Sequence, residues 1–105
     1  MLTGDGPDGP RWSHTSAQLN INLIRLSTGA TIPLHRNIDV DVVLVVVAGT
    51  GSATVETVLH TLQVGDLLVI PRGAERSLRS TSDDFAYVTC HQRRAGLQPQ
   101  DKQVR

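Results

Sequence analysis

The sequence predicts an all-β domain, a sandwich or barrel of short strands. Between residues 18 and 91 the chain shows almost no helical periodicity. Short runs rich in Val, Ile, Leu and Thr recur every few residues and are separated by Gly, Pro and Asp. About eight such strands are typical of a sandwich or barrel. A chain of 105 residues suits one domain of this kind.

The strand pattern occurs in six simple segments and in one that indicates a hairpin, residues 49–62. The simple segments are residues 18–26, 31–35, 41–48, 66–70, 76–80 and 85–91. Pro33 makes its segment short and edge-like, because proline cannot donate to a sheet ladder. Residues 41–48 are apolar on both faces, which is typical of a strand that is covered on both sides.

Two of these segments alternate with a period of two, which separates their faces. In residues 18–26, leucine and isoleucine alternate with asparagine. In residues 85–91, one face is predicted to carry Tyr87, Thr89 and His91, and the other carries small apolar side chains.

Both ends of the chain are poor in apolar residues. Residues 1–11 are rich in Gly, Pro and Asp and are predicted to form a flexible arm, and residues 95–105 a tail. The folded domain is therefore predicted to span residues 12–94. Trp12, directly after the arm, is interpreted as an anchor that ties the arm to the domain or to a partner subunit.

Composition excludes several function classes. Ten basic and ten acidic side chains cancel, so nothing favours nucleic acid or an anionic membrane as a partner. The single cysteine, Cys90, cannot form an internal disulfide, which fits a reducing compartment. The N-terminus lacks the basic and apolar pattern of a signal peptide. We therefore expect a cytoplasmic protein.

Two stretches, GATIPLHRNIDVDVVLVVVAG and GDLLVIPRGAERSLRS, resemble the two sequence motifs of the cupin family. Gly29, His35 and Gly49 occupy the expected positions of the first motif, and Gly65, Pro71 and Gly73 those of the second. The resemblance implies a jelly-roll cupin barrel, a double-stranded β-helix. It also implies a divalent metal inside the barrel, held by two histidines and a glutamate of the first motif and a histidine of the second.

Most of the metal ligands that the resemblance implies are replaced. His35 is kept, but Asn37 stands at the second histidine, Val42 at the glutamate and Arg76 at the third histidine. Valine offers no donor atom, and a guanidinium has no lone pair and repels a cation. We therefore expect no metal cofactor.

One alternative keeps the metal: a divalent ion held by His35 together with Asp41 or His91. Asp41 would have to turn inward through a bulge, because alternation from its neighbour directs it to the opposite face. His91 would have to line the same cavity.

The predicted pocket lies inside the barrel and uses His35, Asn37 and Arg76, with Asp41 and His91 as further ligand-binding candidates. His35 and Asn37 are two residues apart on one strand and share a face. A buried guanidinium needs a negative partner. That partner is either a carboxylate of the chain, which makes Arg76 part of an internal polar plug, or a bound anionic metabolite.

The preferred function is a metal-free protein that binds a small anionic metabolite. An enzyme is the first alternative, either metal-dependent or an acid/base isomerase with His35 as the base. The second is a structural or regulatory module. We expect a homodimer in each case, because residues 41–48 need an outer cover. The sequence assigns no catalytic residue.

Overall fold

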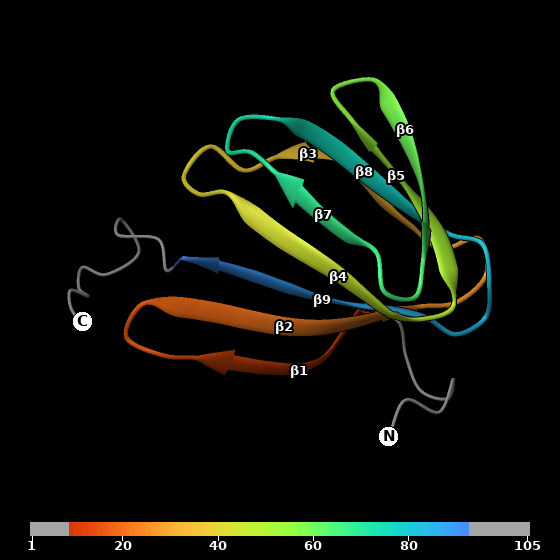
Figure 1. Ribbon diagram of the computed structural model, residues 1–105, viewed down its shortest axis with the longest axis horizontal. Helices are drawn as coiled ribbons and strands as arrows, with labels where there is room; N and C mark the ends of the chain where they lie inside the picture. Colours follow the sequence, from red (N-terminus) through yellow and green to blue (C-terminus); the bar gives the residue numbers. More distant parts are fainter. Residues whose placement is uncertain (1–8, 93–105) are drawn as a thin grey trace.

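The computed structural model describes residues 9–92, which form nine strands and no helix. The strands are β1 Gly9–Thr15, β2 Leu19–Leu26, β3 Thr31–Arg36, β4 Val42–Ala48, β5 Thr50–Val55, β6 Val58–Gln63, β7 Leu67–Ile70, β8 Glu75–Ser80 and β9 Phe85–Gln92. They form two antiparallel sheets that face each other (Figure 1), a five-stranded sheet in the order β1-β2-β9-β4-β7 and a four-stranded sheet in the order β3-β8-β5-β6. This architecture confirms the all-β jelly-roll prediction.

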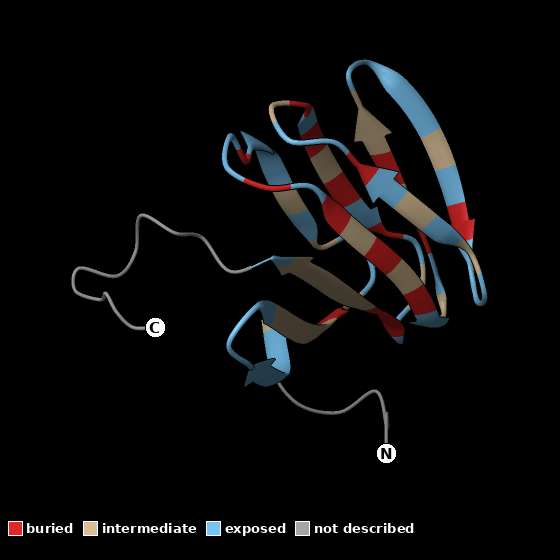
Figure 2. Cartoon of the chain, turned by 60° about the vertical axis from the view of Figure 1, so that its left-hand side comes forward, coloured by how far each residue is buried: buried red, intermediate tan, exposed pale blue. Residues whose placement is uncertain are grey.

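The core lies between the two sheets. Its main cluster combines side chains of both sheets, namely Leu26, Leu44, Val46, Ala53, Leu62, Leu78, Phe85 and Tyr87. Figure 2 shows the buried residues concentrated on the central strands and the exposed ones on the margins. A smaller cluster of Val42, Ile70 and Ala74 packs elsewhere between the same sheets.

Strand β4 is covered on its inner face. Val42, Leu44 and Val46 are buried between the sheets, whereas Val43 and Val45, on the other face, are only partly buried. The cover predicted for this outer face is not supplied by residues 9–92 and stays a prediction.

The hairpin predicted within residues 49–62 is confirmed. Strands β5 and β6 pair from Thr50 with Gln63 to Val55 with Val58. The two turn residues, Glu56 and Thr57, have positive φ angles of 47° and 71°, as the tightest hairpin turns require.

The predicted N-terminal boundary differs from the structure. Strand β1 begins at Gly9, so residues 9–11 belong to the sheet and not to an arm; residues 1–8 and the tail, residues 95–105, lie outside the described residues. Sequence patterns missed β1 because it has almost no apolar alternation. It is an edge strand, held by its ladder with β2 and by hydrogen bonds from Ser13 to Asn22 (2.7 Å) and from Thr15 to Asn20 (2.6 Å). Among the described residues no helix could cross a membrane.

Candidate functional site

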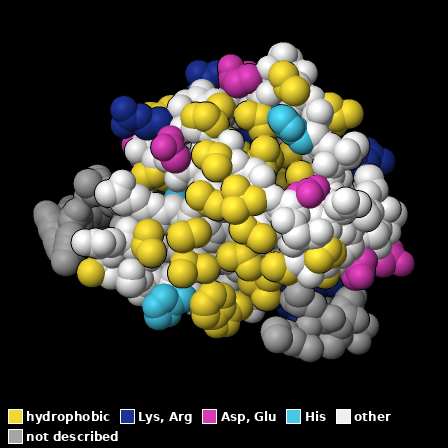
Figure 3. Space-filling view, in the orientation of Figure 1, with side chains coloured by type: hydrophobic (Ala, Val, Ile, Leu, Met, Phe, Trp, Pro, Cys, Tyr) yellow, Lys and Arg dark blue, Asp and Glu magenta, His cyan; other side chains and the backbone are white. Residues whose placement is uncertain are grey.

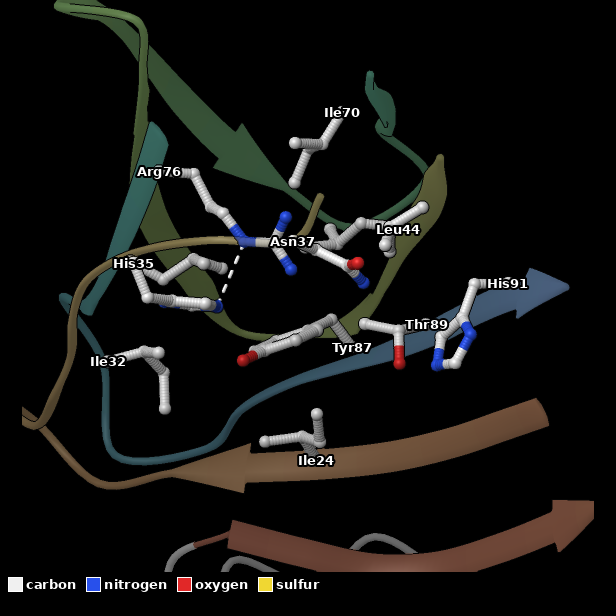
Figure 4. A pocket seen from close by; sticks show the side chains of 12 residues that line it. Ile24, Ile32, His35, Asn37, Leu44, Ile70, Arg76, Tyr87, Thr89 and His91 are labelled. Carbon is white, nitrogen blue, oxygen red and sulfur yellow. Dashed lines mark hydrogen bonds between the residues drawn. The ribbon is translucent and has the colours of Figure 1, made fainter. Parts of the chain in front are cut away.

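A cavity of about 170 Å³ lies between the two sheets (Figure 4). One part of its wall is aliphatic and comprises Ile24, Ile32, Val42, Leu44, Ile70 and Leu78. The other part is polar and comprises His35, Asn37, Arg76, Tyr87, Thr89 and His91. The cavity wall thus combines aliphatic surface with several hydrogen-bonding groups.

His35 and Arg76 meet in this cavity because strands β3 and β8 pair with these two residues opposite each other. The Nε–H of Arg76 donates to Nε2 of His35 over 2.9 Å, the dashed line in Figure 4. Nδ1 of His35 lies 2.9 Å from the carbonyl oxygen of Pro33, which can only accept, so Nδ1 carries the ring proton. His35 is therefore neutral in this arrangement, and the lone pair on its Nε2 accepts the hydrogen bond from Arg76.

Two carboxylates that could pair with Arg76, those of Asp41 and Glu75, do not line the cavity. Asp41 is exposed and accepts a hydrogen bond from the backbone N–H of Arg72 over 2.7 Å. Glu75 forms an ion pair with Arg36, with 3.2 Å between Nη2 and Oε2. Arg76 itself is only 8% exposed. In the part of the chain that the structure describes, no acidic residue contributes to the cavity wall.

Asn37 is held rigidly at the segment that joins β3 to β4. Its Oδ1 accepts from the backbone N–H groups of Asp39 (3.0 Å) and Val40 (3.4 Å), which fixes the orientation of the amide. The residue is 6% exposed, and its Nδ2 is buried without a hydrogen-bond partner among residues 9–92. An unsatisfied buried donor costs about 1–3 kcal/mol, so this nitrogen is set up to donate to a group in the cavity.

Tyr87 and Thr89 also line the cavity, and site prediction from sequence did not include them. Both share a face of β9 with His91, as the alternation predicts, so face assignment could have identified them. Burial raises the pKa of Tyr87 from 10.0 to about 12, although the positive charge of Arg76 acts in the opposite direction. The phenol therefore stays protonated at neutral pH and can donate a hydrogen bond.

The ionisation of Tyr87 can be measured directly, because it is the only tyrosine in the chain. We expect the phenolate absorbance of the folded protein to appear with a pKa of about 12 instead of 10. The unfolded chain releases this proton first as the pH rises. Stability should therefore be intact below pH 10 and fall by on the order of 3 kcal/mol towards pH 12. Tyr87→Phe should remove this component, and a folded-state titration near pH 10 would contradict the buried phenol.

Four of the five predicted site residues line the cavity: His35, Asn37, Arg76 and His91. The fifth, Asp41, does not. In Figure 4, His91 lies at the opposite end of the cavity from the pair formed by His35 and Arg76. Its Nδ1 donates to the carbonyl oxygen of Gln92 over 2.9 Å. Because the two histidines lie at opposite ends of the cavity, they do not form one compact ligand group.

A model of the cupin domain matches residues 22–91 of this sequence. The chain belongs to the cupin family. Similar solved structures include KdgF from Halomonas sp., with a TM-score of 0.74, 20% identity and coverage of 80% of this chain and 77% of that one. The cupin domain of Schizosaccharomyces pombe Cnp3 has a TM-score of 0.71 and 14% identity, covering 82% of this chain and 61% of that one.

A third similar structure is a predicted oxalate decarboxylase from Thermotoga maritima, with a TM-score of 0.65 and 16% identity, covering 69% of this cupin and 64% of that chain. A search of curated protein sequences found no match. These likenesses confirm the fold that the two motifs imply, and identities this low carry no more than the fold.

The residues of this cupin do not fit the divalent metal that its family implies. Val42 has no donor atom, Arg76 brings a positive charge, and the lone pair of His35 is engaged by Arg76. Within residues 9–92, no group of three His, Cys, Asp or Glu side chains is placed to hold a metal ion. The cavity chemistry is therefore that of a hydrogen-bonding pocket with one fixed cation.

Proposed function

We propose that this cupin is a metal-free binding protein whose barrel cavity takes a small monocarboxylate with an apolar body. The observation that carries the proposal is that two groups converge on a cavity with aliphatic walls. They are the guanidinium of Arg76 and the buried Nδ2 of Asn37, which has no hydrogen-bond partner among residues 9–92. A carboxylate supplies an acceptor oxygen for the amide nitrogen of Asn37 and a negative charge for the guanidinium.

Arg76 is oriented for this role by His35. Because Nε is held by the imidazole, the terminal nitrogens of the guanidinium are directed into the pocket (Figure 4). Terminal guanidinium nitrogens pair with carboxylate oxygens in charge-assisted hydrogen bonds that are stronger than neutral ones. Asn37 Nδ2 provides a further donor to the ligand, and the protonated hydroxyl of Tyr87 is another donor of the cavity wall.

The volume limits the size of the ligand. A dry cavity of about 150 Å³ accommodates benzene, so about 170 Å³ suits a ligand of roughly six to nine non-hydrogen atoms. The aliphatic wall of Ile24, Val42, Leu44 and Ile70 favours an aromatic or branched aliphatic body over a sugar or polyacid. Benzoate and 3-methylbutanoate have this size and polarity.

The geometry supports binding over acid/base chemistry. An isomerase that used His35 as its base would need the Nε2 lone pair, which already accepts the Arg76 proton. His35 is better explained as the residue that positions the guanidinium.

Calorimetric titration of chelator-treated protein tests the proposal. We expect benzoate and 3-methylbutanoate to bind with one-to-one stoichiometry. Benzamide should bind at least about tenfold more weakly, because it loses a charge-assisted hydrogen bond worth about 1.5–3 kcal/mol. Inorganic phosphate should bind weakly, since it cannot use the aliphatic wall. Elemental analysis of the purified protein is the control for metal.

Three results would contradict the proposal. If no carboxylate binds, the pocket is not an anion-binding site. Equal binding of benzoate and benzamide would show that Arg76 does not recognise charge. A stoichiometric Fe, Mn, Ni or Zn that resists chelation would restore the metal alternative with His35 and His91.

A further inference from the structure

Strand β2 turns its polar side into the barrel. Asn20 and Asn22 share a face with Ile24, which lines the cavity, so both amides lie on the inner side of the five-stranded sheet. The apolar residues that alternate with them face outward, where Figure 3 shows hydrophobic side chains gathered over the sheet. This is the reverse of an ordinary two-layer protein, in which the apolar face of a strand points to the core. Packing therefore does not explain the inward asparagines.

The strand registers extend these asparagines into two rows across the inner side of the sheet. The first row is Leu44, Thr89, Asn22 and Ser13, and the second row is Val42, His91, Asn20 and Thr15. Both rows are aliphatic on β4 and polar on β9, β2 and β1. The polar shelf is our name for their six polar residues, Ser13, Thr15, Asn20, Asn22, Thr89 and His91. It contains no acidic residue, lysine or arginine.

The polar shelf begins inside the cavity. Thr89 and His91 belong to the cavity wall, and both are partly exposed, so the cavity opens to solvent at this end. Asn20 and Asn22 lie one strand further across the sheet, a step of about 4.8 Å, and are also partly exposed. In Figure 4, His91 lies at the end of the cavity away from Arg76. A ligand whose carboxylate meets Arg76 therefore reaches the polar shelf with its other end.

Hydrogen bonds from β1 fix the orientation of both shelf amides. The hydroxyl of Ser13 donates to Oδ1 of Asn22 over 2.7 Å, and the hydroxyl of Thr15 donates to Oδ1 of Asn20 over 2.6 Å. An amide group is planar, so each Nδ2 points away from the hydroxyl that holds Oδ1 and keeps its N–H groups for another acceptor. Donors that are already oriented lose little entropy when a ligand binds.

The polar shelf also offers an acceptor. Nδ1 of His91 donates to the carbonyl oxygen of Gln92 over 2.9 Å, so Nε2 of the neutral ring carries a lone pair. A ligand group that complements two amide donors and an imidazole acceptor needs a carbonyl oxygen and an N–H of its own. A secondary amide has both. An ionic group is disfavoured, because the shelf contains no acid, lysine or arginine to pair with it.

We propose that the polar shelf binds an uncharged secondary amide, carried by the cavity ligand at the end opposite its carboxylate. This inference rests on the proposed function, because the cavity must hold the carboxylate for the amide to reach the shelf. It narrows the ligand class to carboxylates that carry an acylamino group across an apolar body. In 4-acetamidobenzoate, the benzoate part fills the cavity and the acetamide group lies outside it, on the polar shelf.

Calorimetric titration of the full chain with three compounds tests this inference. Benzoate occupies the cavity alone, and 4-acetamidobenzoate adds the amide. The third compound, 4-isobutylbenzoate, adds an apolar group with as many non-hydrogen atoms as the acetamide. We expect 4-acetamidobenzoate to bind at least about tenfold more tightly than 4-isobutylbenzoate, because the isobutyl group leaves the shelf donors without acceptors.

The double variant Asn20→Asp, Asn22→Asp removes both amide donors and keeps acceptor oxygens for the hydroxyls of Ser13 and Thr15. The preference for 4-acetamidobenzoate over 4-isobutylbenzoate should fall at least about tenfold in this variant. Gln63→Glu is the matched control, since it makes the same change from amide to carboxylate at an exposed position of β6, in the other sheet. It should keep the preference, and circular dichroism checks that both proteins fold.

The outcomes separate this inference from the proposed function. If benzoate binds but the wild-type protein does not prefer 4-acetamidobenzoate to 4-isobutylbenzoate, the polar shelf is wrong and the carboxylate cavity stands. This comparison needs no variant, so it decides even if the double variant does not fold. A folded double variant that keeps the preference would overturn the polar shelf, as would a loss of the preference in Gln63→Glu. If none of the three compounds binds, both the carboxylate cavity and the polar shelf are overturned.

Discussion

Gly49→Ala should lower the free energy of unfolding by about 4 kcal/mol or more, the range in which single substitutions unfold a marginal domain. Gly49 connects β4 to β5 with a φ angle of +69°, a conformation that disfavours any side chain. A Cβ added there would overlap Ser82 Oγ and lie 2.7 Å from the backbone Cα of Phe85. Phe85 is fully buried in the main core, so its backbone cannot move without repacking that core.

Gly65→Ala is the matched control. Gly65 also has a positive φ angle, +94°, but no atom lies within 4 Å of the Cβ position. Only the cost of a side chain in the left-handed backbone conformation remains. We expect the free energy of unfolding to fall by about 1–2 kcal/mol. Denaturant unfolding of both variants separates the two effects. Similar losses would show that crowding against Phe85 contributes little and that the left-handed backbone alone explains the role of Gly49.

This contrast shows what the sequence motif encodes. Gly29, Gly49, Gly65 and Gly73 all have positive φ angles, so the motif spacing predicts turns that the structure confirms. The spacing does not predict which glycine is also crowded. That depends on Phe85, which lies 36 residues later in the chain and meets Gly49 only after the sheets have assembled.

The sequence predicts the part of the candidate site that depends on strand pairing, because the motif positions determine which strands lie opposite each other. His35, Asn37 and Arg76 come together because the motif positions fix β3 and β8 opposite each other. The hydrogen-bond pattern of His35 could not be predicted, because it depends on the carbonyl oxygen of Pro33 and on the rotamer of Arg76. Asp41 was assigned to the pocket only through an assumed bulge, whereas the structure places it in an exposed contact with Arg72.

The orientation of β2 is the larger difference. Alternation shows that Leu19, Ile21 and Leu23 share one face, but it cannot show which face is inward, since a shift by one residue reverses the pattern. The structure directs these residues outward. This result changes an ordinary amphipathic strand into part of an exposed apolar face.

Arg76→Met should abolish carboxylate binding and leave the free energy of unfolding of the unliganded protein within about 1 kcal/mol of wild type. Methionine fills a similar volume and removes the desolvation cost of a buried cation, while His35 loses one hydrogen-bond donor. Loss of the charged group should weaken benzoate binding at least about thirtyfold, since breaking a buried charge pair costs about 2–5 kcal/mol. Calorimetry and denaturant unfolding of the same preparation measure both quantities.

Arg76→Lys separates charge from geometry. Lysine keeps the positive charge but lacks the planar fork, so we expect an intermediate loss of benzoate affinity, about tenfold.

The two variants together also decide between the two roles that the sequence leaves open for Arg76. If the guanidinium is an internal plug that neutralises a carboxylate of the chain, Arg76→Met should destabilise the unliganded protein by about 3–5 kcal/mol, because it would leave that carboxylate buried and unpaired. If Arg76 is the ligand clamp, the same substitution changes affinity and not stability. A stable Arg76→Met protein that binds benzoate like wild type would exclude both roles and would transfer recognition to Asn37 and Tyr87.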